Sequence, residues 1–385
     1  MIISCKLGIC VIVVAIILAV FTQRCLPNQY DPHVYPEKGP FIEGWYMRLI
    51  DADNARSLGV LFGRVLPRGD DGNSPGESSS DAPDTYLGLI RSNGSDASMV
   101  VVEAYPNEDD IEVTVKGGKP VTKNPYLMPS SYFEWTARSY GFFNVTPNST
   151  VFDFTIDEIN FSGNFSGPVA WDSSGRGPEG WLTHLPSLPI HWFVYSLASP
   201  GTYTWRNLDT GRTLSGNAHA HQEKNWGSGF PEGWVWTQGF NKSTNTAFAG
   251  TFGVLSPYGL PAIVPAHLFG YRNFARNLSL DFRPDNSVTT RDLHPCEGRA
   301  AIRIYSPTHR VELTMIAPVA TFDRCLRGPV ETGFEYNLVE TYVATIAISI
   351  EELGLWGYYV IETGTFHSAA FEFGKTYMCP QNPCT

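Results

Sequence analysis

Short runs of β-branched and aromatic residues, interrupted at close intervals by glycine and proline, most limit how this chain can fold. Phe41–Leu49, Ser57–Val65 and Ile190–Leu197 have the length and composition of buried strands. No long stretch repeats apolar residues at the period of an amphipathic helix. The chain is therefore predicted to be all-β, a sandwich or a barrel. Further strands are expected at Tyr86–Ile90, Met99–Ala104, Ile111–Val115, Tyr132–Ala137, Val151–Phe161, Gly201–Arg206, Thr246–Leu255, Leu278–Phe282, Ala300–Tyr305, Val311–Ile316, Glu340–Ile350, Tyr358–Thr363 and Ser368–Phe373.

Chain length and an internal similarity predict two β-domains. The segments FIEGWY, from Phe41, and FPEGWVW, from Phe230, share the pattern F-x-E-G-W. With 385 residues, 43% of them hydrophobic, the chain is long enough to build two cores. We expect the domains to comprise residues 31–215 and 216–378.

The first 24 residues are interpreted as a targeting element. Lys6 precedes a run of 15 apolar residues, Leu7–Phe21, which ends before Arg24. This length suits the apolar region of a signal peptide, whereas a spanning helix usually needs about 20 residues. A signal anchor is the alternative, because Val20 and Thr22 make a poor cleavage site. Both interpretations place the protein in the secretory pathway or outside the cell, with membrane contact only through an uncleaved segment.

Sequons and cysteines agree with secretion. Seven N-x-S/T sequons predict exposed loops that carry N-linked glycans. They are Asn93, Asn144, Asn148, Asn160, Asn164, Asn241 and Asn277. No C-x-x-C pair indicates a zinc site, so we predict the disulfides Cys296–Cys325 and Cys379–Cys384. Their pairing stays open, because spacing alone does not determine connectivity.

The charge balance bears on possible partners. The chain has 27 basic and 38 acidic residues and no basic stripe. Nucleic acids and anionic lipids bind clustered lysine and arginine. Neither is therefore expected as a partner, and no feature of the sequence specifies the oligomeric state.

The stretch Ala218–Gln238, AHAHQEKNWGSGFPEGWVWTQ, combines acid–base groups with bulky aromatic rings. Because side chains alternate along a strand, His219, His221, Glu223 and Asn225 are expected to share one face. Burial beside tryptophan rings should raise the pKa of Glu223 and leave part of it protonated near neutral pH. The alternative is that this face is exposed to solvent.

The opposite face of this segment and the strand that follows it carry further candidate residues. Lys224 points away from Glu223 and can pair with a carboxylate such as Glu43. Trp234, Trp236 and Gln238 share a face, which is either an aromatic pocket wall with one polar group or ordinary core.

Two further segments carry candidate groups. Glu43 or Tyr46 is a candidate for donating or orienting a proton beside Trp45; alternatively, Trp45 fills the core and Glu43 caps a loop. His191 and Trp192 begin another apolar strand, where a histidine can equally be a core residue.

Metal and cofactor chemistry are not expected. His219 and His221 have the spacing of a metal pair, but Glu223 lies about 13 Å along the strand from His219. The sequence contains no phosphate-binding or dinucleotide-binding glycine loop and no G-x-S-x-G nucleophile motif.

Several motifs together resemble the tocopherol-cyclase-like family. They are EKNWGSGFP from Glu223, WVWTQ from Trp234, FIEGWY from Phe41, HWF from His191 and AAFEFG from Ala369. The resemblance runs in order from about residue 35 to residue 375 and implies two lipocalin-like, or calycin-like, β-barrel domains. It also implies an apolar pocket at their junction.

The resemblance assigns residues to that pocket. The positions that match the family's polar groups, and are our catalytic candidates, are Glu43, Tyr46, Glu223, Lys224 and Asn225. The positions expected to line the pocket are Trp45, His191, Trp192, His221, Trp226, Trp234, Trp236 and Gln238.

The resemblance implies ring-forming chemistry on a lipophilic substrate. Plant members close a chromanol ring on a prenylated quinol, and related fungal proteins include hetero-Diels–Alderases that join a terpene to a quinone methide. This chain has a secretory signature in place of a transit peptide and lacks the tryptophan-containing tail of the plant enzymes. We therefore expect an oxygen heterocycle in terpenoid or polyketide secondary metabolism rather than tocopherol. The alternative is a non-catalytic secreted carrier of lipophilic ligands or an extracellular-matrix protein.

Overall fold

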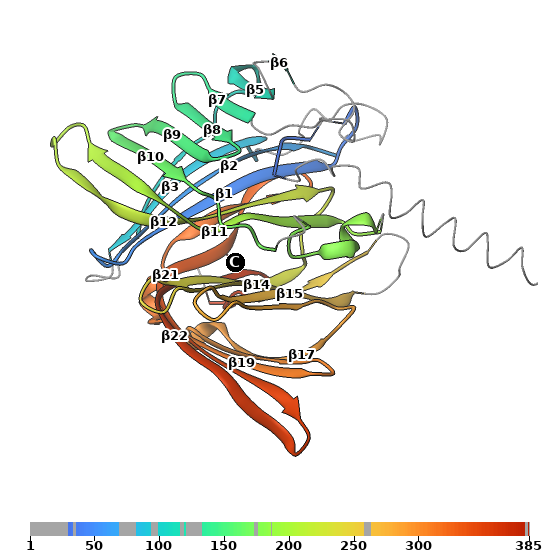
Figure 1. Ribbon diagram of the computed structural model, residues 1–385. Coiled ribbons are helices and arrows are strands. Elements are labelled where there is room, and N and C mark those ends of the chain that lie inside the picture. The colour runs from blue at the N-terminus through green and yellow to red at the C-terminus, as the bar shows by residue number, and fades with distance from the viewer. Residues whose placement is uncertain are drawn as a thin grey trace, which may run out of the picture.

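The computed structural model confirms the all-β prediction (Figure 1). It describes residues 30–33, 36–68, 82–93, 99–115, 119–120, 133–172, 176–185, 187–257, 263–381 and 384. In these ranges the helical segments are short 3₁₀ turns and the rest of the regular structure is strand. The turns are η1 (Glu108–Asp110), η3 (Gly180–His184), η4 (Pro295–Glu297) and η5 (Val319–Phe322).

The N-terminal half of the described chain forms one antiparallel sheet. Its strand order is β4-β3-β2-β1-β12-β11-β10-β9-β8-β7-β5-β6. The strands are β1 (Phe41–Asp51), β2 (Arg56–Leu66), β3 (Thr85–Asn93), β4 (Met99–Ala104), β5 (Ile111–Val115), β6 (Lys119–Pro120), β7 (Phe133–Ala137), β8 (Gly141–Thr146), β9 (Ser149–Ile156), β10 (Ile159–Ser166), β11 (Ile190–Asn207) and β12 (Thr213–Gly227).

The C-terminal half forms a second antiparallel sheet. Its order is β16-β15-β14-β13-β22-β21-β19-β18-β17, and β20 pairs with β21 outside this path. The strands are β13 (Gly233–Asn241), β14 (Thr246–Leu255), β15 (Val264–Asn273), β16 (Leu278–Phe282), β17 (Val288–His294), β18 (Arg299–Tyr305), β19 (His309–Ile316), β20 (Cys325–Val330), β21 (Gly333–Gly354) and β22 (Gly357–Lys375).

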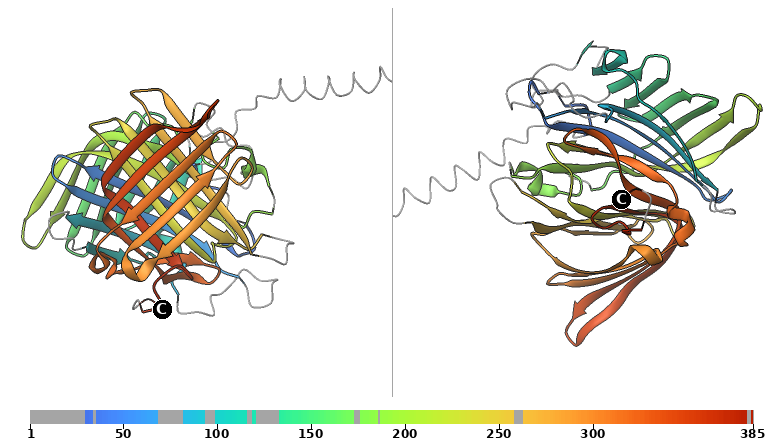
Figure 2. Two further views of the ribbon diagram at one scale, coloured as in Figure 1. Left: turned by 90° about the horizontal axis from the view of Figure 1, so that it is seen from below. Right: turned by 180° about the vertical axis from the view of Figure 1, so that it is seen from behind.

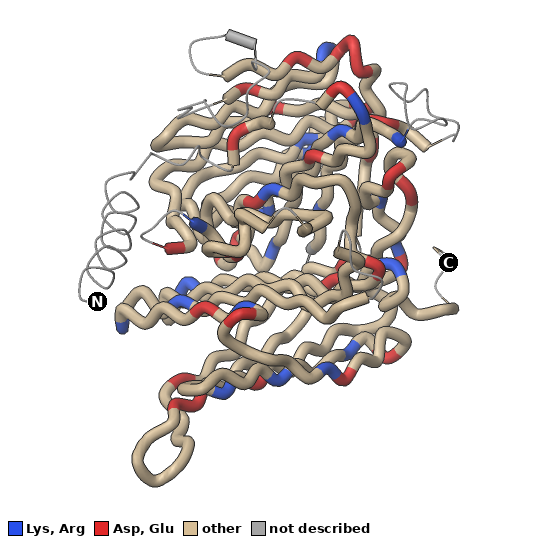
Figure 3. The backbone as a smooth tube through the Cα atoms, turned by 90° about the vertical axis from the view of Figure 1, so that its right-hand side faces the viewer, with Lys and Arg blue, Asp and Glu red and all other residues tan. Residues whose placement is uncertain are grey.

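Each sheet curls around its own hydrophobic core, and the two sheets stack against each other (Figure 2). Alternation along the strands produces this arrangement. In β19, for example, Val311, Leu313 and Met315 are buried while the residues between them are exposed. A third apolar cluster, which includes Tyr46, Trp192 and residues of both sheets, lies between them. Acidic and basic residues are interspersed over the two sheets (Figure 3).

The repeated F-x-E-G-W segments occupy equivalent positions. β1 pairs with β2 and with β12, which is the last strand of this sheet in chain order. β13 likewise pairs with β14 and with β22, the last strand of the second sheet. The boundary expected between residues 215 and 216 falls inside β12, so the division between the sheets lies later, between Gly227 and Gly233.

Three of the expected strand assignments need correction. The run Val151–Phe161 is two strands, because Asp157, with φ of 49°, turns the chain between β9 and β10. By contrast, the segments Ile190–Leu197 and Gly201–Arg206 join in the single strand β11, which absorbs register shifts on either side of Ser196. Tyr358–Thr363 and Ser368–Phe373 likewise belong to one strand, β22.

The sequons do not all lie in loops. Asn144, Asn160 and Asn164 belong to β8 and β10, where they alternate with inward-facing phenylalanines. Asn164 is exposed, whereas Asn144 and Asn160 are half-buried. Outside these strands, Asn148 and Asn277 are exposed. Asn93 ends β3 and Asn241 ends β13.

The four predicted disulfide cysteines are all paired, but not as expected. The bonds join Cys296 to Cys379 and Cys325 to Cys384. The segment after β22 returns to η4 and β20, so each C-terminal cysteine meets a distant partner instead of its neighbour in sequence. Two disulfides are typical of an oxidising environment.

The expected targeting segment, residues 1–24, lies outside the described residues. Among the residues that the structure describes, no helix has both the length and the apolar character needed to cross a membrane.

Removing a disulfide should destabilise the second sheet. We expect Cys296→Ser with Cys379→Ser to lower the free energy of unfolding by about 2–4 kcal/mol, because the crosslink restricts the unfolded chain. Urea unfolding measures this change. Non-reducing peptide mapping should recover Cys296 joined to Cys379, and a peptide joining Cys296 to Cys325 would contradict the assignment.

Candidate functional site

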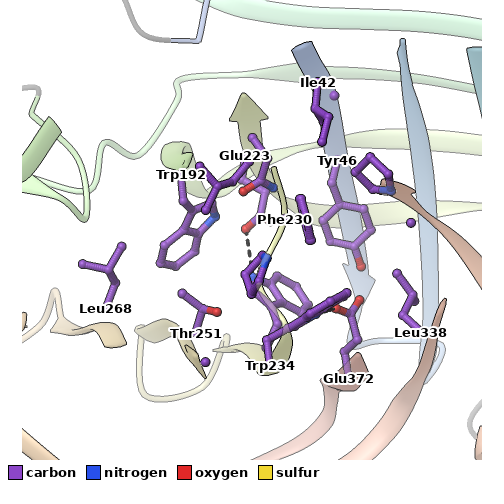
Figure 4. Close-up of a pocket in the computed structure, with 18 of the residues that line it drawn as sticks. Ile42, Tyr46, Trp192, Glu223, Phe230, Trp234, Thr251, Leu268, Leu338 and Glu372 are labelled. Atoms are coloured by element: carbon purple, nitrogen blue, oxygen red, sulfur yellow. Dashed lines mark hydrogen bonds between the residues drawn. The ribbon is translucent and has the colours of Figure 1, made fainter. Parts of the chain in front are cut away.

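An apolar pocket of about 220 Å³ lies between the two sheets. Tyr46 and Glu223 from the first sheet face Trp234 and Glu372 from the second across this space (Figure 4). Trp192 from β11 lines the wall beside Glu223. Side chains from strands far apart in sequence thus enclose one hollow. We call it the intersheet pocket; its lining also includes Ile42, Leu61, Asn225, Phe230, Trp236, Thr251, Leu268 and Leu338.

Glu223 projects from β12 into the intersheet pocket, as alternation along the strand predicts. Its carboxylate Oε2 lies 2.8 Å from His221 Nε2 and accepts a hydrogen bond from Trp236 Nε1 at 3.2 Å. The side chains of Glu223 and His221 are almost completely buried. Two ring nitrogens on one oxygen hold this carboxyl in a fixed orientation at the pocket wall.

Glu372 projects from β22 on the opposite wall. Trp234 Nε1 donates a hydrogen bond to its Oε1 atom. Burial, together with the nearby Glu223 carboxyl, raises the pKa of Glu372 to about 8, although the hydrogen bond from Trp234 opposes the shift. A large fraction of Glu372 is therefore protonated at neutral pH and can act as an acid.

Tyr46 connects the pocket to a second buried carboxyl. Its hydroxyl donates to Glu340 Oε1 at 3.0 Å and lies 2.8 Å from the hydroxyl of Tyr342. Burial and the neighbouring Glu372 raise the pKa of Glu340 well above its usual value, while Arg48 and the Tyr46 hydroxyl oppose the rise. The polar groups behind the pocket therefore form a connected network.

Arg48 supplies a buried positive charge to this network. It follows Tyr46 by two positions in β1 and shares its face. The guanidinium donates to Gln238 Oε1 at 2.6 Å and to Ser57 Oγ at 3.1 Å. It also lies 4.8 Å from the ring centroid of Tyr342. This charge stabilises ionised carboxylates beside it.

Trp192 and Asn225 add polar groups to the wall. They are paired across β11 and β12 and share the pocket face. Glu179 accepts a hydrogen bond from the backbone N–H of Trp192 at 2.6 Å and lies 2.9 Å from His191 Nδ1. Among the residues that the structure describes, the buried indole Nε1 of Trp192 has no hydrogen-bond partner.

Two of the five catalytic candidates lie on the opposite face of the same strands. The side chains of Glu43 and Lys224 point toward the core around which the first sheet curls, and Lys224 Nζ lies 2.8 Å from Glu43 Oε1. The expected pairing of these two residues is thus confirmed. Lys224 also lies 2.8 Å from His33 Nδ1 and donates to the backbone carbonyl of Asp31. These contacts hold residues 30–33 against the sheet. The side chains of Glu43 and Lys224 meet on the face opposite Tyr46 and Glu223, although Glu43 also borders the pocket.

The electrostatics of this pair differ from those of the pocket. Burial alone would raise the pKa of Glu43, but Lys224, His33 and Arg64 outweigh it and hold the pKa well below its usual value. Burial lowers the pKa of Lys224, while Glu43 opposes the shift. Glu43 is therefore held as a carboxylate in an ion pair and is unsuited to donate a proton.

The aromatic candidates divide in the same way. Trp192, Trp234 and Trp236 line the intersheet pocket. Trp45 and Trp226 pack in the core of the first sheet. Trp45 borders the pocket next to Gly44, but its indole donates to the carbonyl of Tyr30 at 2.9 Å. The ring of His191 stacks on that of Trp226, with ring centroids 5.1 Å apart.

No metal site is evident in the described ranges, where no three His, Cys, Asp or Glu side chains group as metal ligands would. His219, in the middle of β12, lies beside Phe240 of β13, with ring centroids 4.5 Å apart.

Four residues of the polar network were missed by the sequence analysis: Arg48, Glu340, Tyr342 and Glu372. A signal for Glu372 exists, since it stands between Phe371 and Phe373, which are buried in the core of the second sheet. Alternation then directs the carboxyl to the other face. Without knowing that this face meets the first sheet, the sequence suggests only an exposed glutamate.

Comparison with proteins of known sequence finds chloroplastic tocopherol cyclases. The chain is 27% identical to the Zea mays tocopherol cyclase over 207 residues, which are 51% of this chain and 41% of the maize protein. It is 36% identical over 66 residues to a probable tocopherol cyclase from Oryza sativa subsp. japonica, covering 17% of this chain and 14% of the rice protein. Both matches span less than half of the relative.

Solved structures share the fold. A structure of CghA with Sch210972 matches with a TM-score of 0.55 and 12% identity, covering 90% of this chain and 96% of CghA. Kievitone hydratase from Nectria haematococca matches with a TM-score of 0.50 and 13% identity, covering 91% and 98% of the two chains. The family model described as tocopherol cyclase-like matches residues 39–375, which include both sheets. The chain therefore belongs to the tocopherol cyclase-like family.

Proposed function

We propose that this protein is a cofactor-free cyclase that forms an oxygen heterocycle on a lipophilic terpenoid or prenylated phenol. One observation carries the proposal: a protonated carboxyl, Glu372, faces a second oriented carboxyl, Glu223, across an apolar pocket. The family and the tocopherol cyclases that the chain resembles support ring closure as the reaction class.

In the proposed reaction Glu372 is the acid. Its carboxyl proton passes to one carbon of the prenyl double bond, and the positive charge develops on the more substituted carbon. The indole rings of Trp192, Trp234 and Trp236 line the pocket and stabilise that charge through their π faces. The apolar walls exclude water, which would otherwise capture the cation.

Glu223 is the proposed base. The phenol oxygen attacks the cationic carbon, and the phenol proton passes to the Glu223 carboxylate. His221 and Trp236 fix the carboxylate so that the oxygen and the alkene are held in a near-attack geometry. The carbon–oxygen bond forms as the phenol O–H bond breaks, and one proton is taken up as another is released. The reaction is an isomerisation and needs no co-reactant.

A quinone methide is the other substrate that this pocket suits. The acid form of Glu372 and the indole N–H of Trp192 are donors that can polarise its carbonyl oxygen, which favours hetero-Diels–Alder addition of an alkene. Both reactions use the same donors and a folded, water-free substrate. Assays with prenylated quinols and with quinone-methide precursors distinguish the two reactions.

We further propose that the protein acts in the secretory pathway or outside the cell. The two disulfides support this assignment, together with the apolar N-terminal run and the sequons.

Replacing the acid should abolish most turnover. With prenylated quinols and quinone-methide precursors as substrates, Glu372→Gln should lower kcat about 10²–10⁴-fold with little change in KM. Glu112→Gln, on an exposed position of β5, is the matched control and should leave both constants unchanged. If purified protein binds these compounds stoichiometrically without accelerating any reaction, the protein is a carrier and the proposal is wrong.

The pH dependence should report the same carboxyl. Glu372 is protonated below its pKa of about 8, so the acid is available below this pH and is lost above it. Turnover should therefore fall on the alkaline side of pH 8. Trp234→Phe removes a hydrogen bond that favours the ionised carboxyl, so the alkaline limb should move to higher pH. Trp205→Phe, in the core of the first sheet, is the control, and an equal movement there would argue against the assignment.

Substitutions on the wall formed by the first sheet should affect kcat and KM differently. Glu223→Gln should mainly lower kcat, because the amide cannot accept the phenol proton. Ile42→Ala should mainly raise KM, because it removes apolar contact area from the wall without removing an aromatic ring or a polar group. Steady-state kinetics test both roles, and the reverse pattern would contradict them.

A further inference from the structure

The hairpin that joins β21 to β22 carries an exposed apolar tip. Leu355 and Trp356 occupy its turn, with 98% and 100% of their surfaces exposed. Figure 1 shows this hairpin extending away from the body of the protein at the end opposite the first sheet. Full exposure of two large apolar side chains has no benefit for folding and indicates a contact made outside the chain.

The composition of the tip changes sharply at its base. The nine residues Leu353–Ile361 contain no charged group, while Glu351, Glu352 and Glu362 flank them on the two strands. Figure 3 shows the same division, with acidic positions at the base of an uncharged loop. The uncharged segment is therefore confined to the end of the hairpin, beyond these glutamates.

The residues just above this boundary are amphipathic. Tyr359 donates its hydroxyl hydrogen bond to Glu352 Oε2 at 2.8 Å, so its ring lies above the carboxylate. Tyr358 lies under the guanidinium of Arg310, 3.7 Å from its ring centroid. Aromatic rings with one polar end are characteristic of the region where lipid headgroups meet acyl chains.

We propose that this tip inserts Leu355 and Trp356 into the surface of a lipid bilayer with zwitterionic headgroups. Leu355 lies three positions beyond Glu352, a length of about 10 Å at the rise of a strand, which matches the depth reached by interfacial segments. A narrow projecting tip suits a fluid surface, whereas a protein partner requires a broader patch. At the base Arg310 lies opposite Glu351 in the pairing of β19 with β21, so its charge is offset and gives anionic headgroups no excess positive charge to bind.

Tryptophan fluorescence gives a specific test on the full chain. The chain has ten tryptophans and none before Trp45, so an apolar N-terminal segment that binds lipid contributes no signal. Eight of the ten are buried, and Trp181 and Trp356 are exposed. Vesicles of brominated phosphatidylcholine should quench wild-type emission. This quenching should persist in Trp181→Phe and be lost in Trp356→Phe.

A second variant keeps the reporter and removes the insertion. Leu355→Asp places a charge in the apolar tip and should abolish quenching of Trp356, while circular dichroism confirms an unchanged fold. Adding phosphatidylglycerol to the vesicles should not strengthen binding. The proposal is overturned if quenching survives in Trp356→Phe, if it is absent from the wild type, or if the tip instead drives concentration-dependent self-association that Leu355→Asp removes.

Discussion

Three carboxyl groups buried close together between two sheets are the constraint on which the rest of this structure depends. Burial raises the pKa of both Glu340 and Glu372, and the neighbouring Glu223 carboxyl raises both further, because each additional negative charge in a dry interior increases the free-energy cost of the next. One consequence is that protons stay on this cluster at neutral pH. The other is that the fold must supply donors, and it does so through Tyr46 and Arg48 and through indole N–H groups. Of these donors, Tyr46, Trp234 and Trp236 also line the pocket.

The pairing of β1 with β12 assigns different tasks to the two faces of the same strands. Trp45 lies opposite Lys224 and Tyr46 lies opposite Glu223, so one face holds the ion pair and the other holds the pocket. A register slip of one residue would exchange these faces. The ion pair of Glu43 with Lys224 forms only in the correct register, because both groups are completely buried and need each other. The face that holds the ion pair therefore fixes the position of the face that lines the pocket.

The sequence predicted the positions of the strands better than it predicted which distant segments contact one another. Apolar runs such as β1 and β14 were recognised because both faces are buried, whereas β17, in which Val288 is exposed, lacks a clear pattern. Both Glu223 and Trp234 line the pocket, whereas alternation alone left a solvent-exposed face and ordinary core as the alternatives. Alternation also predicted that Lys224 lies on the face opposite Glu223, whereas the motif match grouped Lys224 with the catalytic candidates. Glu372 and the disulfide partners depend on contacts between distant segments, which local patterns do not encode.

In the reaction proposed above, the strength of Glu372 as an acid restricts which substrates can react in this pocket. A carboxyl with a pKa of about 8 is far too weak to protonate an ordinary alkene unaided. Most of the barrier must therefore be removed by other means: attack of the oxygen as the proton arrives, charge stabilisation by the indole rings, and exclusion of water. Only a substrate that holds its nucleophilic oxygen next to a substituted double bond, or a quinone methide already polarised toward addition, meets this condition. In the proposed reaction the weak acid thereby provides selectivity, since alkenes without such an internal partner would enter the pocket and leave unchanged.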